Sequence, residues 1–238
     1  MHTSSLHTTD DRALPRLANN RLLASLPDDD QLQLAEKCET VRVENGQLLS
    51  EPGEEIRYVY FPIDCLISLL GVAEGRMTLE IGSLGREGML GASVVLGHEL
   101  AQVRAVVQRS GRVYRLAVGD FVTEFYRMES LRRLVHRYTD GMLAQAIQIA
   151  VCSRFHVLEA RLARSLLITR DRLRSDKFHL THEFLAHALG VRRVGVTKAA
   201  SALQQQKLIT YSRGNIEILD STGLEAVSCH CYDLFKEK

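Results

Sequence analysis

Residues 180–219 read LTHEFLAHALGVRRVGVTKAASALQQQKLITYSRGNIEIL. Thr181 has the hydroxyl side chain that favours a helix start, and the apolar-periodic run after it ends at Gly190, a residue typical of the position just past a helix. A second periodic run begins at Val191 and continues to Leu203. The stretch therefore predicts two short helices joined by a tight turn, which is a helix-turn-helix.

Two short strand-like segments follow the second helix. Residues 208–211 and 216–219 are apolar and alternating, and the intervening Ser-Arg-Gly-Asn at 212–215 predicts a hairpin with a Gly-Asn turn. A helix pair with such a wing indicates binding to double-stranded DNA. The alternative is an ordinary amphipathic helix pair in a globular core.

The second helix is expected to have two different faces. At about 100° per residue, the apolar side carries Val196, Ala199, Ala200 and Leu203. The opposite side carries Val194, Thr197, Lys198 and Ser201, with Arg193 on its flank. A recognition helix needs this arrangement, because its N-terminal residues reach base edges while the other side packs on the domain.

Basic residues are segregated along the chain. The 238 residues carry 30 Lys and Arg against 29 Asp and Glu, a net charge of +1. Residues 154–213 contain 12 of the basic and 4 of the acidic residues, a local charge of +8, which leaves 18 basic and 25 acidic residues, or −7, elsewhere. A basic module on an acidic body favours a phosphate-backbone partner for that module, against the alternative of a solvated charged surface.

The chain has the features of a cytoplasmic protein. The absence of an apolar run of roughly 18 residues predicts no transmembrane helix and no membrane partner. The polar start of the chain lacks the apolar segment of a secretory signal. An odd number of scattered cysteines predicts reduced thiols. They are Cys38, Cys65, Cys152, Cys229 and Cys231.

Short strands separated by Gly-containing turns dominate residues 41–117, which predicts a small barrel or jelly roll. Residues 131–156 instead predict a long helix with a heptad seam, best explained as a dimerisation helix; a helix buried within one chain is the alternative. The candidate dimer-interface residues are Leu131, Val135, Tyr138, Met142, Gln145 and Ile149. A second stripe of Leu134, Leu143, Ile147 and Val151 would give the helix one side for the barrel and another for a partner.

Barrel, long helix and winged helix-turn-helix, in that order, resemble the Crp/Fnr family of bacterial transcription regulators. The likeness is strongest in LEARLARSLL at 158–167 and LTHEFLAHALGV at 180–191. It implies an α+β protein with a cyclic-nucleotide-binding-like β-roll, a homodimer on a near-palindromic DNA site, and contact with RNA polymerase. The expected units are a disordered tail at 1–18, a β-roll at 19–125, a dimerisation helix at 126–157 and a winged helix-turn-helix at 158–238.

The resemblance assigns roles in the second helix. Arg193 matches the family arginine that pairs with guanine, and Lys198 matches a later base- or phosphate-binding arginine. Arg192, Val194 and Gly195 depart from the family's serine, glutamate and threonine, so the consensus half-site is not expected. Thr181 and His182 match phosphate-gripping positions. The candidate DNA-binding residues are Thr181, His182, Arg192, Arg193, Val194, Gly195, Thr197, Lys198, Ser201 and Arg213.

The β-roll departs from the family's cyclic-nucleotide binders. Those carry an acidic ribose ligand, and Ala92 stands at the nearest matching position; Arg104 is the one candidate for a phosphate ligand. We therefore expect regulation without a cyclic nucleotide, with the effector unknown and no cofactor. A cyclic-nucleotide-gated regulator is the alternative.

Other chemistry-like patterns are weak. His182 and His187 are five residues apart, where a zinc-protease helix needs four. The sequence Cys229-His230-Cys231 is compatible with a metal- or redox-responsive tail, but it lacks further clustered ligands, so we expect neither a metal site nor an enzyme.

Overall fold

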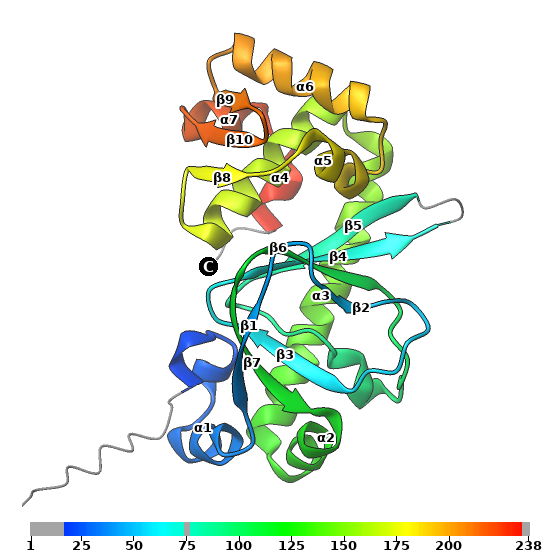
Figure 1. Cartoon of the computed structure of the whole chain (residues 1–238), viewed down its shortest axis with the longest axis vertical. Helices are drawn as coiled ribbons and strands as arrows, with labels where there is room; N and C mark the ends of the chain where they lie inside the picture. The colour runs from blue at the N-terminus through cyan, green and yellow to red at the C-terminus, as the bar shows by residue number, and fades with distance from the viewer. Residues whose placement is uncertain (1–16, 74–76, 235–238) are drawn as a thin grey trace, which may run out of the picture.

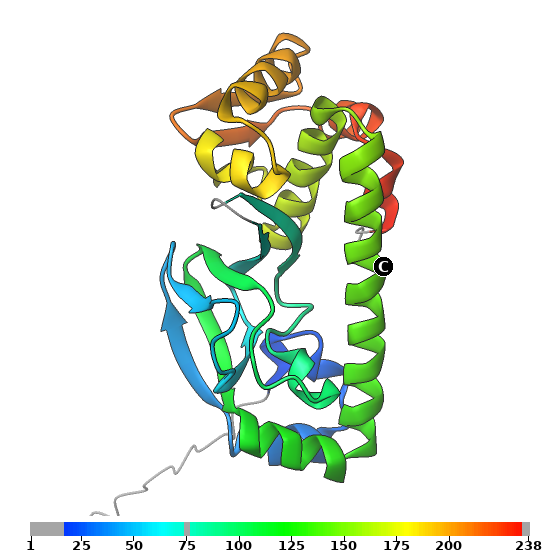
Figure 2. The same cartoon turned by 90° about the vertical axis from the view of Figure 1, so that its right-hand side faces the viewer.

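The computed structural model describes residues 17–73 and 77–234. A β-rich unit lies at one end and a smaller helical unit at the other, with one long helix running along both (Figures 1 and 2). None of the helices in these two ranges combines the length and apolar character that a membrane span requires.

The described part of the chain begins with short helical turns, η1 (Leu17–Asn19) and η2 (Leu23–Ser25), followed by α1 (Asp28–Ala35). Three aspartates occupy the first turn of α1, where carboxylates interact favourably with the helix dipole. Leu17 is fully buried in the core. The predicted tail at 1–18 therefore extends too far at its C-terminal end, while residues 1–16 lie outside the described residues.

Two antiparallel sheets form the β-roll. One has the order β1-β7-β3 and the other β2-β6-β4-β5. Their bounds are β1 Glu39–Val43, β2 Leu48–Ser50, β3 Tyr58–Pro62, β4 Leu66–Val72, β5 Thr78–Leu84, β6 Arg104–Arg109 and β7 Gly111–Ala117, with the turn η4 at Ala92–Leu96. All of these strands lie in or overlap residues 41–117, the stretch predicted to form short strands, so the predicted β-roll is confirmed.

The long helix is α3 (Glu129–Phe155), which follows the shorter α2 (Val118–Arg127). Leu131 and Val135 are fully buried and Ile149 is 6% exposed, all within the single chain. Tyr138 donates a hydrogen bond to the Met89 carbonyl oxygen at 2.8 Å. Leu131, Val135 and Ile149 are therefore covered within the chain, and their prediction as dimer-interface residues is wrong. Met142 and Gln145 are partly exposed, and their place in an interface stays a prediction.

The C-terminal unit is built from α4 (Leu158–Leu173), α5 (His182–Leu189), α6 (Arg193–Gln205) and α7 (Ser221–Val227), with η5 (His230–Leu234) last. A three-stranded sheet of order β8-β10-β9 covers one side. Its strands are β8 Lys177–His179, β9 Ile209–Ser212 and β10 Asn215–Ile218. Leu162, Leu166 and Leu203 lie in its continuous apolar core.

The two units touch through strand β5. Thr78 and Leu79 approach the C-terminal end of α5 at His187 and Gly190. Arg172 of α4 pairs with Glu87 at 2.8 Å and also donates a hydrogen bond to Ser83. The barrel and the helical unit are therefore joined by polar contacts as well as by the long helix.

Candidate nucleic-acid interface

The first helix of the motif, α5, is capped at both ends as predicted. The Oγ1 of Thr181 accepts a hydrogen bond from the Phe184 amide at 3.1 Å, which satisfies one free donor of the first turn. Gly190 follows the last turn with φ of +64°, a conformation that glycine adopts without a side-chain penalty. The chain can therefore turn sharply into α6.

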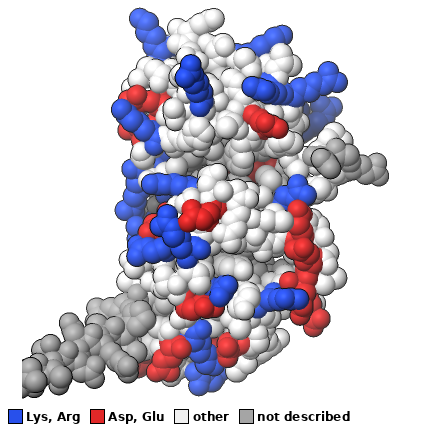
Figure 3. Space-filling model, in the orientation of Figure 1, with Lys and Arg blue, Asp and Glu red and all other residues white. Residues whose placement is uncertain are grey.

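Helix α6 has the two predicted faces. Val196, Ala199 and Leu203 are buried against the domain core. The exposed face includes Arg193, Val194, Thr197, Lys198 and Ser201. Figure 1 shows α6 at the outer end of the molecule, and Figure 3 shows Lys and Arg side chains projecting from that end. The exposed face is thus open to a large partner.

Two arginines lie at the N-terminal end of α6, where a positive charge is electrostatically unfavourable. Arg192 is the N-cap of α6 and Arg193 its first residue, and the first turn contains no acidic residue. The helix N-terminus carries a partial positive charge, so cations there cost about 0.3–1 kcal/mol each. Both side chains are exposed. A polyanion bound at this end would offset that cost.

Gly195 lies on the inner side of α6. A Cβ added there would lie 3.0 Å from Cδ2 of Leu158 in α4, and the residue is half-buried. Glycine permits the close approach of the two helices. The structure therefore gives Gly195 a packing role against α4, and its predicted contact with DNA stays a prediction.

The wing is a tight hairpin, as expected, with its turn one residue earlier. Ser212 pairs with Asn215, so Arg213 and Gly214 are the two loop residues. Both have positive φ, +50° and +88°, which is the conformation of a type I′ turn. A Cβ at Gly214 would overlap the His179 ring, which requires glycine there. Arg213 is exposed at the hairpin tip.

His182 connects three elements. Its ring stacks on Tyr211 of the wing at a centroid distance of 4.1 Å, and its Nδ1 lies 3.1 Å from Oγ1 of Thr197 in α6. Burial and the nearby Arg193 lower the pKa of His182, which favours the neutral ring. The half-buried imidazole therefore holds α5, α6 and the wing in a fixed arrangement beside the candidate DNA surface.

The outer side of α3 carries an apolar stripe that the described residues 17–73 and 77–234 leave exposed. Leu143 is 60% exposed, Ile147 56% and Val151 43%, followed by Phe155 at 74%. The first three belong to the second stripe of the sequence pattern, whose remaining member, Leu134, is buried. Figure 2 shows α3 along one edge of the molecule. Contiguous exposed apolar residues on a helix mark a surface for association.

A cavity of about 770 Å³ lies between the barrel and α3. Its walls are largely apolar and include Leu69, Ile81, Leu90, Tyr138 and Met142. Gly91, with φ of +94°, and Ala92 line it as well. The methyl group of Ala92 can accept no hydrogen bond from a ribose hydroxyl.

The structure does not place Arg104 in this cavity. Its Nε donates a hydrogen bond to Oε1 of Glu51 at 2.7 Å, and both side chains are about one-third exposed. Arg57 is the arginine among the described lining residues, and it pairs with Glu55 at 3.3 Å. This arrangement therefore lends no support to Arg104 as a phosphate ligand inside the barrel, and that role stays a prediction.

Comparisons with known proteins agree with this geometry. Residues 160–227 match the family model of the Crp-like helix-turn-helix domain. A comparison with curated protein sequences found no match.

Three solved structures illustrate the likeness. A Crp/Fnr-family protein of Eubacterium rectale has a TM-score of 0.71 and 16% identity, covering 88% of this chain and 98% of its own. A Crp/Fnr-family transcriptional regulator of Thermus thermophilus has a TM-score of 0.67 and 24% identity, covering 80% and 98%. The c-di-GMP responsive global regulator CLP of Xanthomonas campestris has a TM-score of 0.68 and 13% identity, covering 81% and 99%.

These likenesses span the barrel, the long helix and the winged unit together. The chain thus carries a Crp-like helix-turn-helix domain on a cyclic-nucleotide-binding-like β-roll, in the fold of the Crp/Fnr-family transcriptional regulators.

Proposed function

We propose that this protein is a homodimeric, sequence-specific DNA-binding transcription regulator. The observation that carries the proposal is the exposed polar face of α6, which begins with two arginines at a helix N-terminus and lies beside a wing tipped by Arg213. An α-helix fits the major groove of DNA, where the first residues of a recognition helix meet base edges.

The exposed residues fall into two groups, those suited to contact bases and those suited to contact phosphates. The guanidinium of Arg193 suits the O6 and N7 acceptors of guanine, and the 60% exposed Val194 suits a thymine methyl group. Lys198 and Ser201 lie further along the same face. Arg192, Arg213 and Thr181 are exposed at a helix start, the wing tip and the start of α5, and for them we infer contacts to phosphates rather than bases.

Dimerisation through α3 would bring a second α6 helix into the complex. The exposed apolar stripe of Leu143, Ile147 and Val151 fits an identical stripe on a second copy, because isologous contacts pair the same patch of both chains. Two α6 helices related by a two-fold axis would read a near-palindromic operator in successive major grooves. By family resemblance, the bound dimer contacts RNA polymerase, and as a chromosome-binding protein it acts in the cytoplasm.

The barrel is proposed to work without a cyclic nucleotide. Ala92 lacks the acceptor for a ribose, and Arg104 is engaged with Glu51 outside the cavity. The apolar walls favour an effector of mainly apolar character. The alternative, a cyclic-nucleotide-gated regulator, would need Arg57 to leave Glu55 and bind the phosphate.

Selection from a randomised double-stranded DNA library tests the function. The full-length protein should enrich a near-palindromic motif with half-sites centred about 10–10.5 base pairs apart. A Lys198→Ala variant should bind the selected operator more weakly, and Lys207→Ala, an exposed lysine after the end of α6, is the matched control. Failure to enrich any motif would contradict sequence-specific binding.

A further inference from the structure

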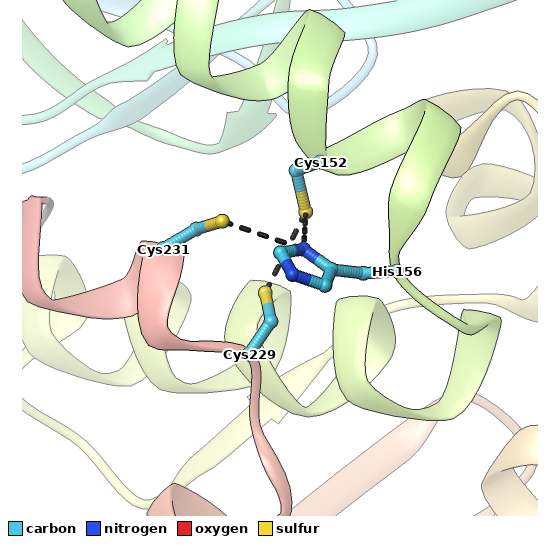
Figure 4. Close-up of side chains that lie close together, drawn as sticks. All are labelled: Cys152, His156, Cys229 and Cys231. Carbon is cyan, nitrogen blue, oxygen red and sulfur yellow. Dashed lines mark hydrogen bonds between the residues drawn. The ribbon is translucent and has the colours of Figure 1, made fainter.

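Two pairs of side chains that are distant from each other in sequence converge at the junction between α3 and α4. Cys152 lies in the last turn of α3, and His156 caps that helix one turn later. Cys229 follows α7, and Cys231 belongs to η5. Figure 4 shows the three thiols and the imidazole facing a common centre. The three Sγ atoms and one imidazole nitrogen all lie within 4.8 Å of one another.

The spacing matches the edges of one coordination tetrahedron. With Zn–S near 2.3 Å and Zn–N near 2.0–2.1 Å, tetrahedral ligands lie about 3.8 Å apart for two sulfurs and about 3.6 Å for sulfur and nitrogen. Sγ of Cys152 and Sγ of Cys229 are 3.5 Å apart. Nδ1 of His156 lies 3.4 Å from Sγ of Cys152 and 3.5 Å from Sγ of Cys231. These three distances are within a few tenths of an ångström of the ideal edges, and the remaining ligand-to-ligand distances do not exceed 4.8 Å.

The surroundings are those of a closed site. Cys152, Cys229 and Cys231 are 0%, 5% and 4% exposed, and His156 is half-buried. These cysteines form a cluster of their own, separate from the larger apolar cores. Gln148 donates a side-chain hydrogen bond to Sγ of Cys231 at 2.9 Å. Such outer hydrogen bonds orient the ligands of metal sites.

Nearby charges suit an anionic metal centre. Arg161 and Arg164 are 8% and 7% exposed, and both guanidinium groups are electrostatically coupled to Cys152 and Cys229. Three thiolates and a neutral imidazole around a divalent ion carry a net charge of −1. Buried cations beside this centre would offset its charge, because buried charges are stabilised by close opposite charges.

We propose that Cys152, His156, Cys229 and Cys231 bind one Zn²⁺ as a closed structural site. Soft thiolate ligands in a tetrahedral arrangement favour zinc, and four ligand atoms this close suit one ion rather than a multi-iron cluster. Binding replaces the three thiol protons, which pass to solvent, and no oxidation or reduction is involved. The ion would fasten the C-terminal segment to the end of α3 and fix the direction in which α4 leaves it.

Elemental analysis of the purified full-length protein, kept reduced and without chelator, tests the proposal. We expect about one zinc ion per chain in the wild type. Cys231→Ser and His156→Ala should lower this content to a small fraction, whereas Cys38→Ser and Cys65→Ser, which lie in the barrel unit, should leave it unchanged. Zinc content that is equally low in all five proteins after growth with added zinc would overturn the site.

Two measurements on the unaltered chain keep the test valid if a variant fails to fold. A mercurial thiol reagent should release zinc in step with modification of the three ligand cysteines. Refolding with Co²⁺ should give the absorption of tetrahedral cobalt with thiolate ligands. A Cys152–Cys229 disulfide without metal, or iron with inorganic sulfide in place of zinc, would each overturn the assignment.

Discussion

The Oγ1 of Thr78, on the barrel strand β5, donates a hydrogen bond to the backbone carbonyl of His187, in the last turn of α5, at 3.1 Å. Nδ1 of the same histidine lies 3.3 Å from that hydroxyl. The contact places the barrel directly against the first helix of the DNA-binding motif. A change in the barrel that moves β5 therefore acts on the orientation of α5 without passing through α3.

Glu80, two residues further along β5, makes the stability of this region pH-dependent. Burial raises the pKa of Glu80 to about 7, opposed by Arg172 and by a hydrogen bond from Ser68. The folded chain therefore keeps a proton that the unfolded chain releases near pH 4.3. The free energy of unfolding should fall by up to about 3 kcal/mol between about pH 5 and about pH 8 from this group.

In the Glu80→Gln variant this contribution is absent, so its free energy of unfolding should not fall in this way as pH rises. Urea denaturation of both proteins across that pH range measures the difference in their free energies of unfolding. The wild type should lose stability relative to the variant as pH rises. If the free energies of unfolding of the two proteins differ by the same amount at all pH values, Glu80 is ionised in the folded protein.

Arg213 should show opposite effects on stability and on DNA binding. Its φ of +50° is unfavourable for arginine, whereas asparagine tolerates the left-handed conformation of a type I′ turn. Arg213→Asn should therefore stabilise the fold by about 0.5–1 kcal/mol. It should also weaken operator binding and lower the salt slope by about one per lost phosphate contact.

Thermal unfolding and salt-dependent binding isotherms measure both quantities on the same preparation. Arg109→Asn, on barrel strand β6, is the charge-matched control and should leave the salt slope unchanged. Unchanged DNA affinity in Arg213→Asn would show that the wing tip does not contact DNA.

The exposed stripe of α3 predicts how the dimer can be broken. Ile147→Glu places a charge in the proposed interface and should yield monomers at micromolar concentration, as measured by light scattering. Leu100→Glu replaces an apolar side chain of similar exposure, 54% against 56%, in the barrel unit and should leave the dimer intact. A wild type that is itself monomeric, yet binds its operator fully, would rule out the dimer.

Local patterns in the sequence were sufficient to predict most elements. The strands of the β-roll and the limits of α5 follow from alternation, turn residues and the Thr181 and Gly190 caps, all of which act over a few residues. The faces of α6 follow from helical periodicity alone. Strand β8 was missed because Lys177–His179 is too short to show a pattern.

Sequence patterns could not predict contacts between segments that are far apart in the chain. The heptad of α3 identifies apolar positions but not their partner, so Leu131 and Val135 were assigned to a second chain although the barrel covers them. Cys152 and His156 are four residues apart, on one helix face, and this spacing was a usable signal. Their meeting with Cys229, 77 residues beyond Cys152, depends on the tertiary fold.

Cyclic nucleotides should leave DNA binding unchanged. The expectation rests on Ala92, whose side chain offers no acceptor in the cavity, and on the ion pair that holds Arg104 outside it. Isothermal titration with cyclic AMP and cyclic GMP should detect no binding, and operator affinity should be the same with either nucleotide present. A tenfold gain in operator affinity would favour the cyclic-nucleotide-gated alternative and direct attention to Arg57.

Helix α6 is proposed to contact base edges while its N-cap residue, Arg192, contacts the DNA backbone. Competition binding of the wild type, Arg193→Ala and Arg192→Ala on a randomised operator library, at two salt concentrations, tests it most directly. Arg193→Ala should lose about 1–3 kcal/mol of discrimination at one base pair in each half-site. Arg192→Ala should weaken all sequences about equally and lower the salt slope. Base preferences that survive in Arg193→Ala but shift in Arg192→Ala would contradict this placement of the helix in the groove.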